Sequence, residues 1–382
     1  MKIAFVGLKG IPAKYGGIEH HVENLSRRLA EQGHEVTVFC RNDYTLSKER
    51  LGRVKLIRLP RFPFRYLETI SHSLISFVMA QFDNFDIIHL HNLGIQWLAI
   101  MSPLIKPIVI CTLHAPSWEE TQWGSLGRIY LRLCLKVSAA LADGFIAVST
   151  PLALEVKRVT GRQPYIIPNG VGLPDPGGQD ICERYGLQAG FYILTVGRII
   201  PDRAIEILLK AVKCLPEKLK VAVVGDSKQH LSYIQQLKEI GKDRAVFAGY
   251  VFGQELATLY ANAALYVHPS RVEGQSIALL EAMWFGRCVI ASNIPANVEI
   301  LQNCKIGEDY TIGFTFKVDD VNDLSQRLKY LVERQDIVKK VGLNAARAVR
   351  NLHNWDKITK ETIKVYKEIQ KEKKKRIYLN PE

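Results

Sequence analysis

The stretch Lys2-Ile3-Ala4-Phe5-Val6-Gly7 decides the fold class, because a short apolar run that ends at a glycine is typical of a buried strand in a parallel sheet. A glycine-rich turn occupies residues 8–17. Residues 18–32 then carry apolar side chains at helical spacing, and residues 35–40 form the next apolar run. Strand, helix and strand in this order predict a βαβ unit.

The same alternation of strands and helices continues, stops once and restarts. Residues 165–178 contain several prolines and glycines and are predicted to be a linker. Strand-like runs lie at 54–59, 86–92, 108–114 and 144–149 before the linker, and at 192–197, 221–225, 246–249, 264–269 and 288–292 after it. We therefore predict two doubly wound, Rossmann-like α/β domains, residues 1–168 and 169–354, that face each other across a ligand-binding cleft. From residue 320 the chain is predicted to be helical, and the last helix spans about 355–371.

The length, the composition and the cysteine pattern of the chain fit a cytoplasmic protein of two domains. The chain has 382 residues, which is too many for one ordinary core, and 47% of them are hydrophobic. Its seven cysteines are scattered and form no CxxC pair, so neither a zinc site nor a disulfide framework is indicated, and a reducing compartment is expected. The sequence contains no signal-peptide pattern and no run of eighteen apolar residues, so we expect attachment to a membrane at its surface at most.

The formal net charge of +13 indicates an anionic partner, such as nucleic acid, anionic lipid or a phosphorylated substrate. No zinc finger, RNP aromatic motif or basic zipper is present, so no nucleic-acid partner is expected. The basic run at residues 371–376 is predicted to be a solvated tail.

Two carboxylates stand eight residues apart within residues 270–286. Ser276 is a favourable helix N-cap and Gly286 a favourable stop. Glu273 is therefore predicted on the loop that enters a helix, and Glu281 inside that helix. The free amides of the helix start form an anion site, so the stretch can hold a phosphate between two acceptors of hydroxyl hydrogen bonds. This pattern suits a nucleotide-sugar, but a surface glutamate before an ordinary amphipathic helix fits it equally well.

Polar residues also follow strands of the first predicted domain. His91, His114 and Ser149 fall at carboxyl ends of strands, where ligands of such sheets bind. The Gly16-Gly17 turn can bring backbone amides close to a phosphate or a sugar at a helix start. The turn does not read G-x-G-x-x-G, so the dinucleotide fingerprint is weak.

Over its whole length the chain resembles the GT-B glycosyltransferases of glycosyltransferase family 4. The resemblance rests on several motifs in the right order: Gly16-Gly17, the His114 strand end, residues 167–171, residues 196–198, helix 253–262, residues 268–270, the Glu273 and Glu281 pair, and residues 355–358. In this fold the last helix, residues 355–382, crosses back onto the first domain. Residues 9–34 are similar to a bacterial, rhamnosyltransferase-like subgroup that acts in surface polysaccharide assembly.

The resemblance implies retaining transfer of a sugar from a nucleotide-diphosphate donor without a bound metal or another cofactor. Glu281 would accept hydrogen bonds from the ribose hydroxyls, and Glu273 would hold hydroxyls of the donor sugar. The amides near Gln275, Ser276 and Ile277 would bind the sugar or the β-phosphate. His114 would contact the sugar near its anomeric carbon, and Gly16 and Gly17 would approach the diphosphate and the acceptor. The leaving phosphate oxygen would itself take the acceptor proton, so no enzymic base is required.

The residues support a metal-free site independently, since no Asp-x-Asp pair follows a strand to hold a divalent cation. Cationic side chains must then neutralise the leaving diphosphate, and Arg198 and Arg203 suit that task. The family usually has Glu-Lys-Gly where this chain has Asp202-Arg203-Ala204, and arginine keeps the charge. It more often has Phe-Gly at positions 275 and 276, so Gln275 and Ser276 mark a different donor sugar. UDP is the default nucleotide.

A glycan or a polyprenyl-linked acceptor is expected, because family members often use lipid-linked acceptors. Residues 53–66 mix cations with aromatics, and Arg128, Arg132 and Lys136 recur at helical spacing beside Ile129 and Leu133. Such surfaces can lie on anionic lipid, which predicts a peripheral site at the inner face of the plasma membrane. Alternatively, the long cationic side chains only cover the edges of the core.

Other functional classes remain open from the sequence. A different GT-B enzyme, such as a nucleotide-sugar epimerase or a phosphorylase, would share the fold, although a phosphorylase needs a pyridoxal-binding lysine that we cannot locate. A nicotinamide oxidoreductase is disfavoured by the missing G-x-G-x-x-G. A non-catalytic nucleotide-sugar-binding protein is disfavoured by the presence of Glu281, Arg198 and His114 together.

Overall fold

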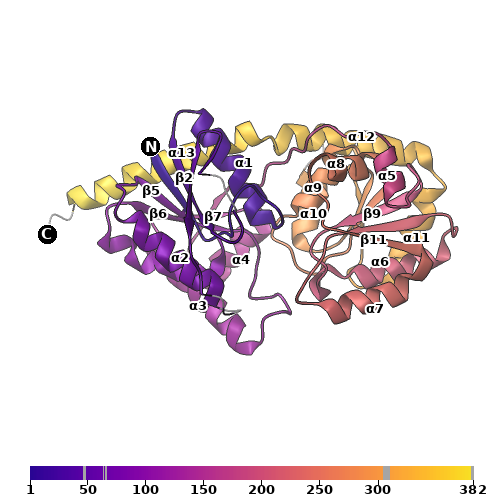
Figure 1. Ribbon diagram of the computed structural model, residues 1–382, viewed down its shortest axis with the longest axis horizontal. Coiled ribbons are helices and arrows are strands. Elements are labelled where there is room, and N and C mark those ends of the chain that lie inside the picture. The colour runs from indigo at the N-terminus through magenta and orange to yellow at the C-terminus, as the bar shows by residue number, and fades with distance from the viewer. Residues whose placement is uncertain (46–48, 63, 65–66, 304–309, 380–382) are drawn as a thin grey trace. The chain divides into compact units, whose positions relative to one another are not determined.

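The chain divides into two compact units, and each is described by itself. The computed structural model describes residues 1–45, 49–62, 64, 67–303 and 310–379. Unit 1 comprises Met1–Gly170 together with the C-terminal segment from Trp355, and unit 2 comprises Val171–Asn354. The boundary therefore lies two residues after the expected one, and Asn169 and Gly170 belong to unit 1. The C-terminal segment belongs to unit 1 as well (Figure 1).

Unit 1 is built on an eight-stranded sheet with the order β3-β4-β2-β1-β5-β6-β7-β8, in which every neighbouring pair is parallel except β3 and β4. The strands are β1 Lys2–Val6, β2 Glu35–Arg41, β3 Arg50–Leu51, β4 Val54–Leu59, β5 Ile87–Leu90, β6 Ile108–Leu113, β7 Gly144–Ala147 and β8 Tyr165–Ile166. The short strand β8 at the sheet edge corrects the expectation that the whole of residues 165–178 is linker, because Tyr165 and Ile166 pair with Ile146 and Ala147.

Helices cover both faces of this sheet, as continuously apolar parallel strands require. The helical segments are α1 Gly17–Glu31, α2 Leu67–Ala80, the 3-10 segment η1 Leu93–Leu104, α3 Ser125–Leu141, α4 Thr150–Thr160 and α13 Trp355–Leu379. One core layer contains side chains of α2, η1, α3 and α4, and the other contains side chains of α1 and α13. Figure 1 shows α13 running alongside α1.

The basic segment near the C-terminus is helical, and its side chains from Lys371 to Lys375 are exposed, as predicted, except that of Lys373. Helix α13 continues through it to Leu379, beyond the expected end near residue 371. The Lys373 ammonium lies 2.9 Å from the Asp143 carboxylate and donates hydrogen bonds to the carbonyl oxygens of Ser102 and Pro107. The lysine therefore anchors α13 to the end of η1, because those carbonyls would otherwise lack a donor.

Unit 2 has a six-stranded, all-parallel sheet with the order β11-β10-β9-β12-β13-β14. The strands are β9 Tyr192–Val196, β10 Lys220–Val224, β11 Ala245–Gly249, β12 Leu265–His268, β13 Val289–Ser292 and β14 Phe314–Phe316. The last of these was missed from the sequence, because three residues at a sheet edge give too short a pattern. The two doubly wound sheets confirm the predicted fold class.

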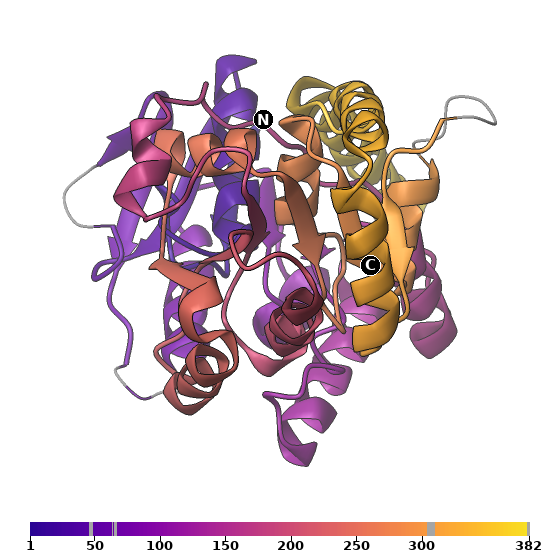
Figure 2. The same cartoon turned by 90° about the vertical axis from the view of Figure 1, so that its right-hand side faces the viewer.

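The helices of unit 2 also form two layers around the sheet (Figure 2). Side chains of α6, α7 and α11 enter one core layer, and side chains of α5, α8, α9, α10 and α12 dominate the other. The helical segments are α5 Asp180–Arg184, η2 Pro201–Arg203, α6 Ile205–Ala211, η3 Val212–Cys214, α7 Leu231–Gly241, η4 Lys242–Arg244, α8 Gly253–Asn262, α9 Ile277–Trp284, α10 Pro295–Asn303, α11 Val321–Val332 and α12 Gln335–Leu352.

Candidate functional site

In each unit the strand order reverses beside one strand, and ligands of open α/β sheets bind at such a point. In unit 2 that strand is β9, which lies between β10 and β12. Arg198 follows β9, and Glu273 lies on the loop after β12. In unit 1 the strand is β1, which lies between β2 and β5. His91 directly follows β5, and His114 directly follows the next strand, β6.

The predicted loop and helix around the two carboxylates are confirmed. Ser276 caps α9, because its hydroxyl oxygen accepts a hydrogen bond from the Leu279 amide at 3.2 Å. Gly286 ends the helix with a φ of 69°, a conformation that favours glycine. The amides of Ile277 and Ala278 have no hydrogen-bond partner in the part of the chain that the structure describes. They are donors available to an anion.

Glu273 is a carboxylate whose side chain is only 10% exposed and that stays ionised. Its Oε1 atom lies 2.9 Å from Nη1 of Arg203 and 3.0 Å from Nε2 of His268. Burial alone would raise the pKa of Glu273, but the charge of Arg203 and hydrogen bonds from His268 and Ser270 lower it to about 2. The carboxylate is thus fixed as an acceptor on the loop.

Glu281 is buried, and the described part of the chain gives it no cationic partner. Tyr260 donates its phenolic hydrogen to Oε2 of Glu281 at 2.9 Å. Burial raises the pKa of Glu281 to about 7, and the Tyr260 hydrogen bond opposes the rise. A carboxylate with one neutral donor and no counter-charge has room for further donors, such as the hydroxyls of a ligand.

A row of aromatic side chains joins the two carboxylates. Tyr260 packs against Tyr266 with ring centroids 5.8 Å apart, and the Tyr266 hydroxyl lies 3.3 Å from Nδ1 of His268. His268 in turn contacts Glu273. The sequence analysis did not identify Tyr260 and Tyr266, because an aromatic residue on a predicted helix or strand is usually an ordinary core residue. Their hydroxyl contacts are the signal that distinguishes them.

The two predicted arginines differ in their surroundings. Arg203 donates from Nη1 to the Val272 carbonyl oxygen at 2.7 Å as well as pairing with Glu273. Arg198 is exposed, and its guanidinium has no hydrogen-bond or ion-pair partner among the described residues. Arg203 therefore shapes the loop, whereas Arg198 is a cation available to a ligand.

Ala204 occupies the position at which the family usually has glycine. Its φ of 48° and ψ of 36° place it in the left-handed region, which costs an alanine roughly 1 kcal/mol. Full burial of its methyl group among apolar neighbours offsets this strain. The turn that positions Arg203 is therefore kept despite the substitution.

The departures at Gln275 and Ser276 lie inside the site. Both side chains are buried, and the next residue, Ile277, is half-buried. Serine in place of glycine supplies the side-chain cap of α9, which stabilises a helix by only about a few tenths of a kcal/mol relative to glycine at that position.

In unit 1 the Gly16-Gly17 turn opens α1. Gly16 is the N-cap, with a φ of 102°, and a Cβ atom there would lie 2.1 Å from Oε2 of Glu19. Only glycine fits, because the Glu19 carboxylate folds back beneath the turn and accepts a hydrogen bond from the Lys9 amide at 3.0 Å. Gly17 is exposed at the helix start.

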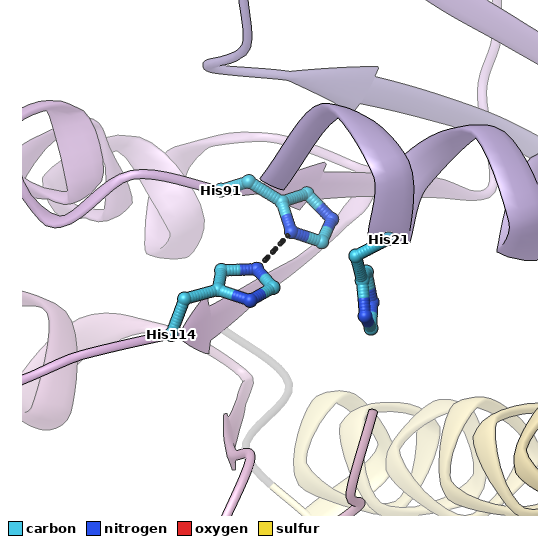
Figure 3. Close-up of side chains that lie close together, drawn as sticks. All are labelled: His21, His91 and His114. Atoms are coloured by element: carbon cyan, nitrogen blue, oxygen red, sulfur yellow. Dashed lines mark hydrogen bonds between the residues drawn. The ribbon is translucent and has the colours of Figure 1, made fainter. Parts of the chain in front are cut away.

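His114 lies in a cluster of three histidine side chains from three elements of unit 1 (Figure 3). Its Nε2 atom is 2.8 Å from Nδ1 of His91, and the His21 ring meets it edge-on with centroids 4.8 Å apart. Ser149 does not join these residues through its side chain. Its hydroxyl oxygen instead accepts a hydrogen bond from the Leu152 amide at 3.4 Å and caps α4.

His21 and Asn169 are site neighbours that the sequence did not reveal. Nδ1 of His21 lies 2.9 Å from Oδ1 of Asn169, although 148 residues separate them. Gly170 packs directly beneath the Trp355 ring, where a Cβ atom would lie 2.3 Å from the indole. Residues that read as linker therefore hold the histidine cluster against α13.

The histidines of this cluster are neutral at ordinary pH. Burial lowers the pKa of His21 to about 4, although the Asn169 hydrogen bond opposes this. Burial, aided by the neighbouring histidines, lowers the pKa values of His91 and His114 well below 6.5. His114 can thus donate or accept a hydrogen bond, but it does not carry a positive charge.

Comparison with known proteins assigns both halves of the chain. Residues 15–173 match the family model described as Glycosyltransferase Family 4, and residues 190–334 match the model of Glycosyl transferases group 1. A phosphatidyl-myo-inositol mannosyltransferase of Propionibacterium freudenreichii is 25% identical over 379 residues, which cover 93% of this chain and 92% of the relative.

Solved structures show the same fold over nearly the whole chain. A sucrose-phosphate synthase from Thermosynechococcus elongatus superposes with a TM-score of 0.83 at 23% identity, covering 96% of this chain and 98% of the other. HepE from Anabaena in complex with UDP-glucose superposes with a TM-score of 0.79 at 19% identity, covering 96% of this chain and 100% of HepE. These likenesses identify the fold as GT-B.

Proposed function

Because the chain belongs to the family 4 type of GT-B glycosyltransferases, we propose that it transfers a sugar, with retention of configuration, from a nucleotide-diphosphate donor to a glycan or lipid-linked acceptor of the cell surface. The observation that carries the proposal is the surroundings of Glu281. A buried carboxylate without a cation suits the paired hydroxyls of a ribose. The donor proposed by default is a UDP-sugar, in keeping with the UDP-glucose bound by the Anabaena protein.

The other residues of unit 2 have matching chemistry. Glu273 accepts hydrogen bonds from hydroxyls of the donor sugar, and the amides of Ile277 and Ala278 donate to the sugar or the β-phosphate. Arg198 and Arg203 provide positive charge for the diphosphate as it leaves, so we propose that no metal ion is needed. The bond between the anomeric carbon and the phosphate oxygen breaks, the acceptor oxygen bonds to that carbon, and the acceptor proton passes to the leaving phosphate.

In unit 1, the neutral His114 would steady the sugar near its anomeric carbon, and the amides that follow Gly16 would approach the diphosphate. The hydrogen bond from His91 fixes the His114 ring in one orientation. An imidazole held in this way assists transfer by preorganised polarity rather than by charge, which agrees with its lowered pKa.

A panel of nucleotides tests the donor class. We expect UDP or GDP, but not NAD, to raise the melting temperature, because a ligand at a hundred times its dissociation constant adds about 2.7 kcal/mol to the free energy of unfolding. Incubation of UDP-sugars with a polyprenyl-diphosphate sugar extract should then yield a product whose anomeric configuration matches the donor, with or without EDTA. Stabilisation by NAD alone, or epimerisation without transfer, would contradict the proposal.

The raised pKa of Glu281 predicts pH-dependent donor binding. Ribose hydroxyls donate to the ionised carboxylate, so affinity for UDP should fall up to roughly tenfold per pH unit as the pH is lowered below about 7. Calorimetric titrations across this range measure the effect. The Glu281→Gln variant should bind UDP more weakly and without this dependence. An affinity of the wild-type protein that does not change with pH would contradict the assignment.

The same shift has a signed effect on stability. The folded-state pKa of Glu281, about 7, lies above the unfolded value of 4.5. The stabilisation that the protonated carboxyl gives to the folded state is therefore fully present below pH 4.5 and is lost as the pH rises through 7. Above pH 7 the Glu281→Gln variant should therefore unfold at a higher temperature than the wild-type protein in the absence of ligand.

We also propose that unit 1 docks on anionic lipid through the layer formed by α2, η1, α3 and α4. No helix within the described residues is long and apolar enough to span a bilayer. On α3, however, Leu126, Ile129 and Leu133 are 84%, 55% and 56% exposed, and Arg132 and Lys136 are exposed beside them. Further exposed apolar residues of the same layer are Leu74, Val78, Met79, Ile100, Met101, Leu104 and Leu154. An apolar surface of this extent with interspersed cations is typical of peripheral membrane proteins.

Some of the predicted basic residues contribute little charge to this surface. Arg128 is half-buried and donates to the Trp123 carbonyl oxygen, and Arg61 is paired with Asp43 and Glu68. Phe62 and Phe64 are exposed, whereas positions 63, 65 and 66 lie outside the described residues. The phosphatidyl-myo-inositol in the name of the mannosyltransferase relative is a lipid, which supports an acceptor presented by a membrane.

Flotation with vesicles of phosphatidylglycerol and phosphatidylcholine tests this surface. Reversing Arg132 and Lys136 to glutamate should weaken vesicle binding at least tenfold, since each cation near the surface contributes about 1 kcal/mol. Ile129→Asp should also weaken it, whereas Leu343→Asp is a matched control because Leu343 is 53% exposed on α12 of unit 2. The membrane proposal fails if the wild-type protein does not float with anionic vesicles.

A further inference from the structure

Three imidazole rings converge in unit 1 from elements far apart in the sequence. His21 lies in the second turn of α1, His91 directly follows β5, and His114 directly follows β6. Each ring offers one nitrogen such that these three atoms all lie within 4.8 Å of one another (Figure 3). His21 and His91 are buried, whereas His114 is only half-buried. The cluster can therefore be reached from the surface at one ring.

The hydrogen bonds around the cluster leave lone pairs on its nitrogens. The side-chain oxygen Oδ1 of Asn169 accepts a hydrogen bond from Nδ1 of His21, which leaves a lone pair on Nε2 of His21. Nε2 of His91 is buried and has no hydrogen-bond partner among the residues that the structure describes. A buried N–H without an acceptor is rare, so we place the His91 hydrogen on Nδ1, from which it is donated to Nε2 of His114. By contrast, both nitrogens of the neighbouring His89 are hydrogen-bonded, to Tyr366 and Thr112.

We propose that His21, His91 and His114 form a binding site for one transition-metal ion of the Zn²⁺ class. Three imidazoles are a ligand set that Zn²⁺, Cu²⁺ and Ni²⁺ favour and that Mg²⁺ and Ca²⁺ do not. Asn169 acts as the outer-shell partner that fixes the ring of a metal-binding histidine, a feature shared by most such sites.

The spacing of the rings fits this class of ion. Zinc-to-nitrogen bonds of about 2.1 Å in a tetrahedral arrangement set the ligand atoms roughly 3.4 Å apart. The widest nitrogen pair would have to close by a little more than 1 Å, which rotation of the rings can supply. Coordination replaces the hydrogen bond between His91 and His114, because the His114 lone pair then binds the ion. The Nδ1 hydrogen of His91 loses its acceptor, which costs about 1–3 kcal/mol, and the zinc–nitrogen bonds offset this because zinc sites of proteins bind with roughly 10–16 kcal/mol.

The ion would inhibit the enzyme rather than serve it. This part of the inference rests on the proposed function, in which a neutral His114 contacts the donor sugar. A bound ion fixes that ring and adds positive charge beside a centre where positive charge develops. The site is thus distinct from the metal-free handling of the diphosphate that we propose for Arg198 and Arg203.

Direct binding tests the site without any enzymatic assay. Untagged, metal-stripped protein is titrated with ZnCl₂ by calorimetry and with CoCl₂ by visible absorption. We expect one ion per chain, a tetrahedral Co²⁺ spectrum and no corresponding binding of Mg²⁺. Affinity should fall at least tenfold in His21→Gln and in His114→Gln, and by a similar factor in Asn169→Ala. His20→Ala is the matched control, because this neighbouring histidine lies outside the cluster and its loss should change nothing.

Two results would overturn the site: no Zn²⁺ binding by the wild-type protein, or equal binding by both glutamine variants. Thermal unfolding of the variants shows whether they are folded, and the half-buried His114 keeps the test available if His21→Gln is not. In a transfer assay, Zn²⁺ should inhibit the wild-type enzyme at concentrations that leave His21→Gln active. Failure to find any transfer activity would remove the proposed function but leave the calorimetric test of the site intact.

Discussion

Replacing Arg198 with alanine lowers kcat by roughly 100- to 1,000-fold and leaves the melting temperature unchanged, if the proposed role is correct. The guanidinium is exposed directly after β9 and has no partner in the described residues, so its removal breaks no contact of the fold. Its charge is needed when the diphosphate leaves, because we assign no metal ion to that task. The effect should therefore appear in turnover more than in UDP affinity.

Matched variants make the Arg198 result specific. Arg198→Lys keeps the charge without the planar fork and should recover part of the rate. Arg347→Ala removes an equally exposed arginine from α12 of unit 2 and should leave turnover unchanged. Full activity of Arg198→Ala in steady-state assays would refute the role.

Replacing Arg203 with methionine is expected to lower the free energy of unfolding by about 3–5 kcal/mol at neutral pH and to abolish transfer. The pair that it forms with Glu273 has side chains only 18% and 10% exposed, at a distance of 2.9 Å. Without the arginine, the desolvated Glu273 carboxylate is left without its main counter-charge, and the Val272 carbonyl oxygen loses a donor. Urea unfolding at several pH values measures the loss.

The pH dependence of this effect has a definite sign. In the wild-type protein the pKa of Glu273 is about 2, below the unfolded value of 4.5, so the stabilisation by its ionised form is present above pH 4.5 and is lost as the pH falls towards 2. Without Arg203, burial dominates and raises that pKa. The stability difference between wild type and Arg203→Met should therefore shrink as the solution is acidified.

A double variant separates stability from catalysis. Adding Glu273→Gln to Arg203→Met removes the unpaired charge, so most of the lost stability should return while transfer stays abolished. An Arg203→Met variant as stable as the wild-type protein at pH 7 would show that the ion pair does not hold the loop. A double variant with restored transfer would contradict the role of both residues.

The local pattern of the sequence was sufficient for the fold and for one half of the site. Short apolar runs predicted most of the strands, and a serine followed by an apolar run and Gly286 predicted α9 to the residue at its cap. These features depend on residues within a few positions of one another, so hydrophobic periodicity and capping chemistry suffice. The strands β3, β8 and β14 were not predicted, because segments of two or three residues are too short to show an alternation of apolar and polar side chains.

Only the tertiary structure decided which side chains meet. Strand order places His91 beside His114 and α1 places His21 over both, and the loop after β12 brings Glu273 to Arg203, seventy positions earlier. Lys373 likewise reads as part of a solvated tail until α13 is seen to hold it against Asp143.

The sequence by itself therefore determined two α/β sheets, a capped helix with one carboxylate before it and one inside it, and the resemblance to a family. The tertiary structure decided that Arg203 keeps Glu273 ionised, that Glu281 has no cation beside it within the described residues, and that three histidine rings lie close together. The reason is physical: a pKa, an ion pair or a ligand set depends on burial and on neighbours across the sheet. A period of two or 3.6 residues carries no information about those neighbours.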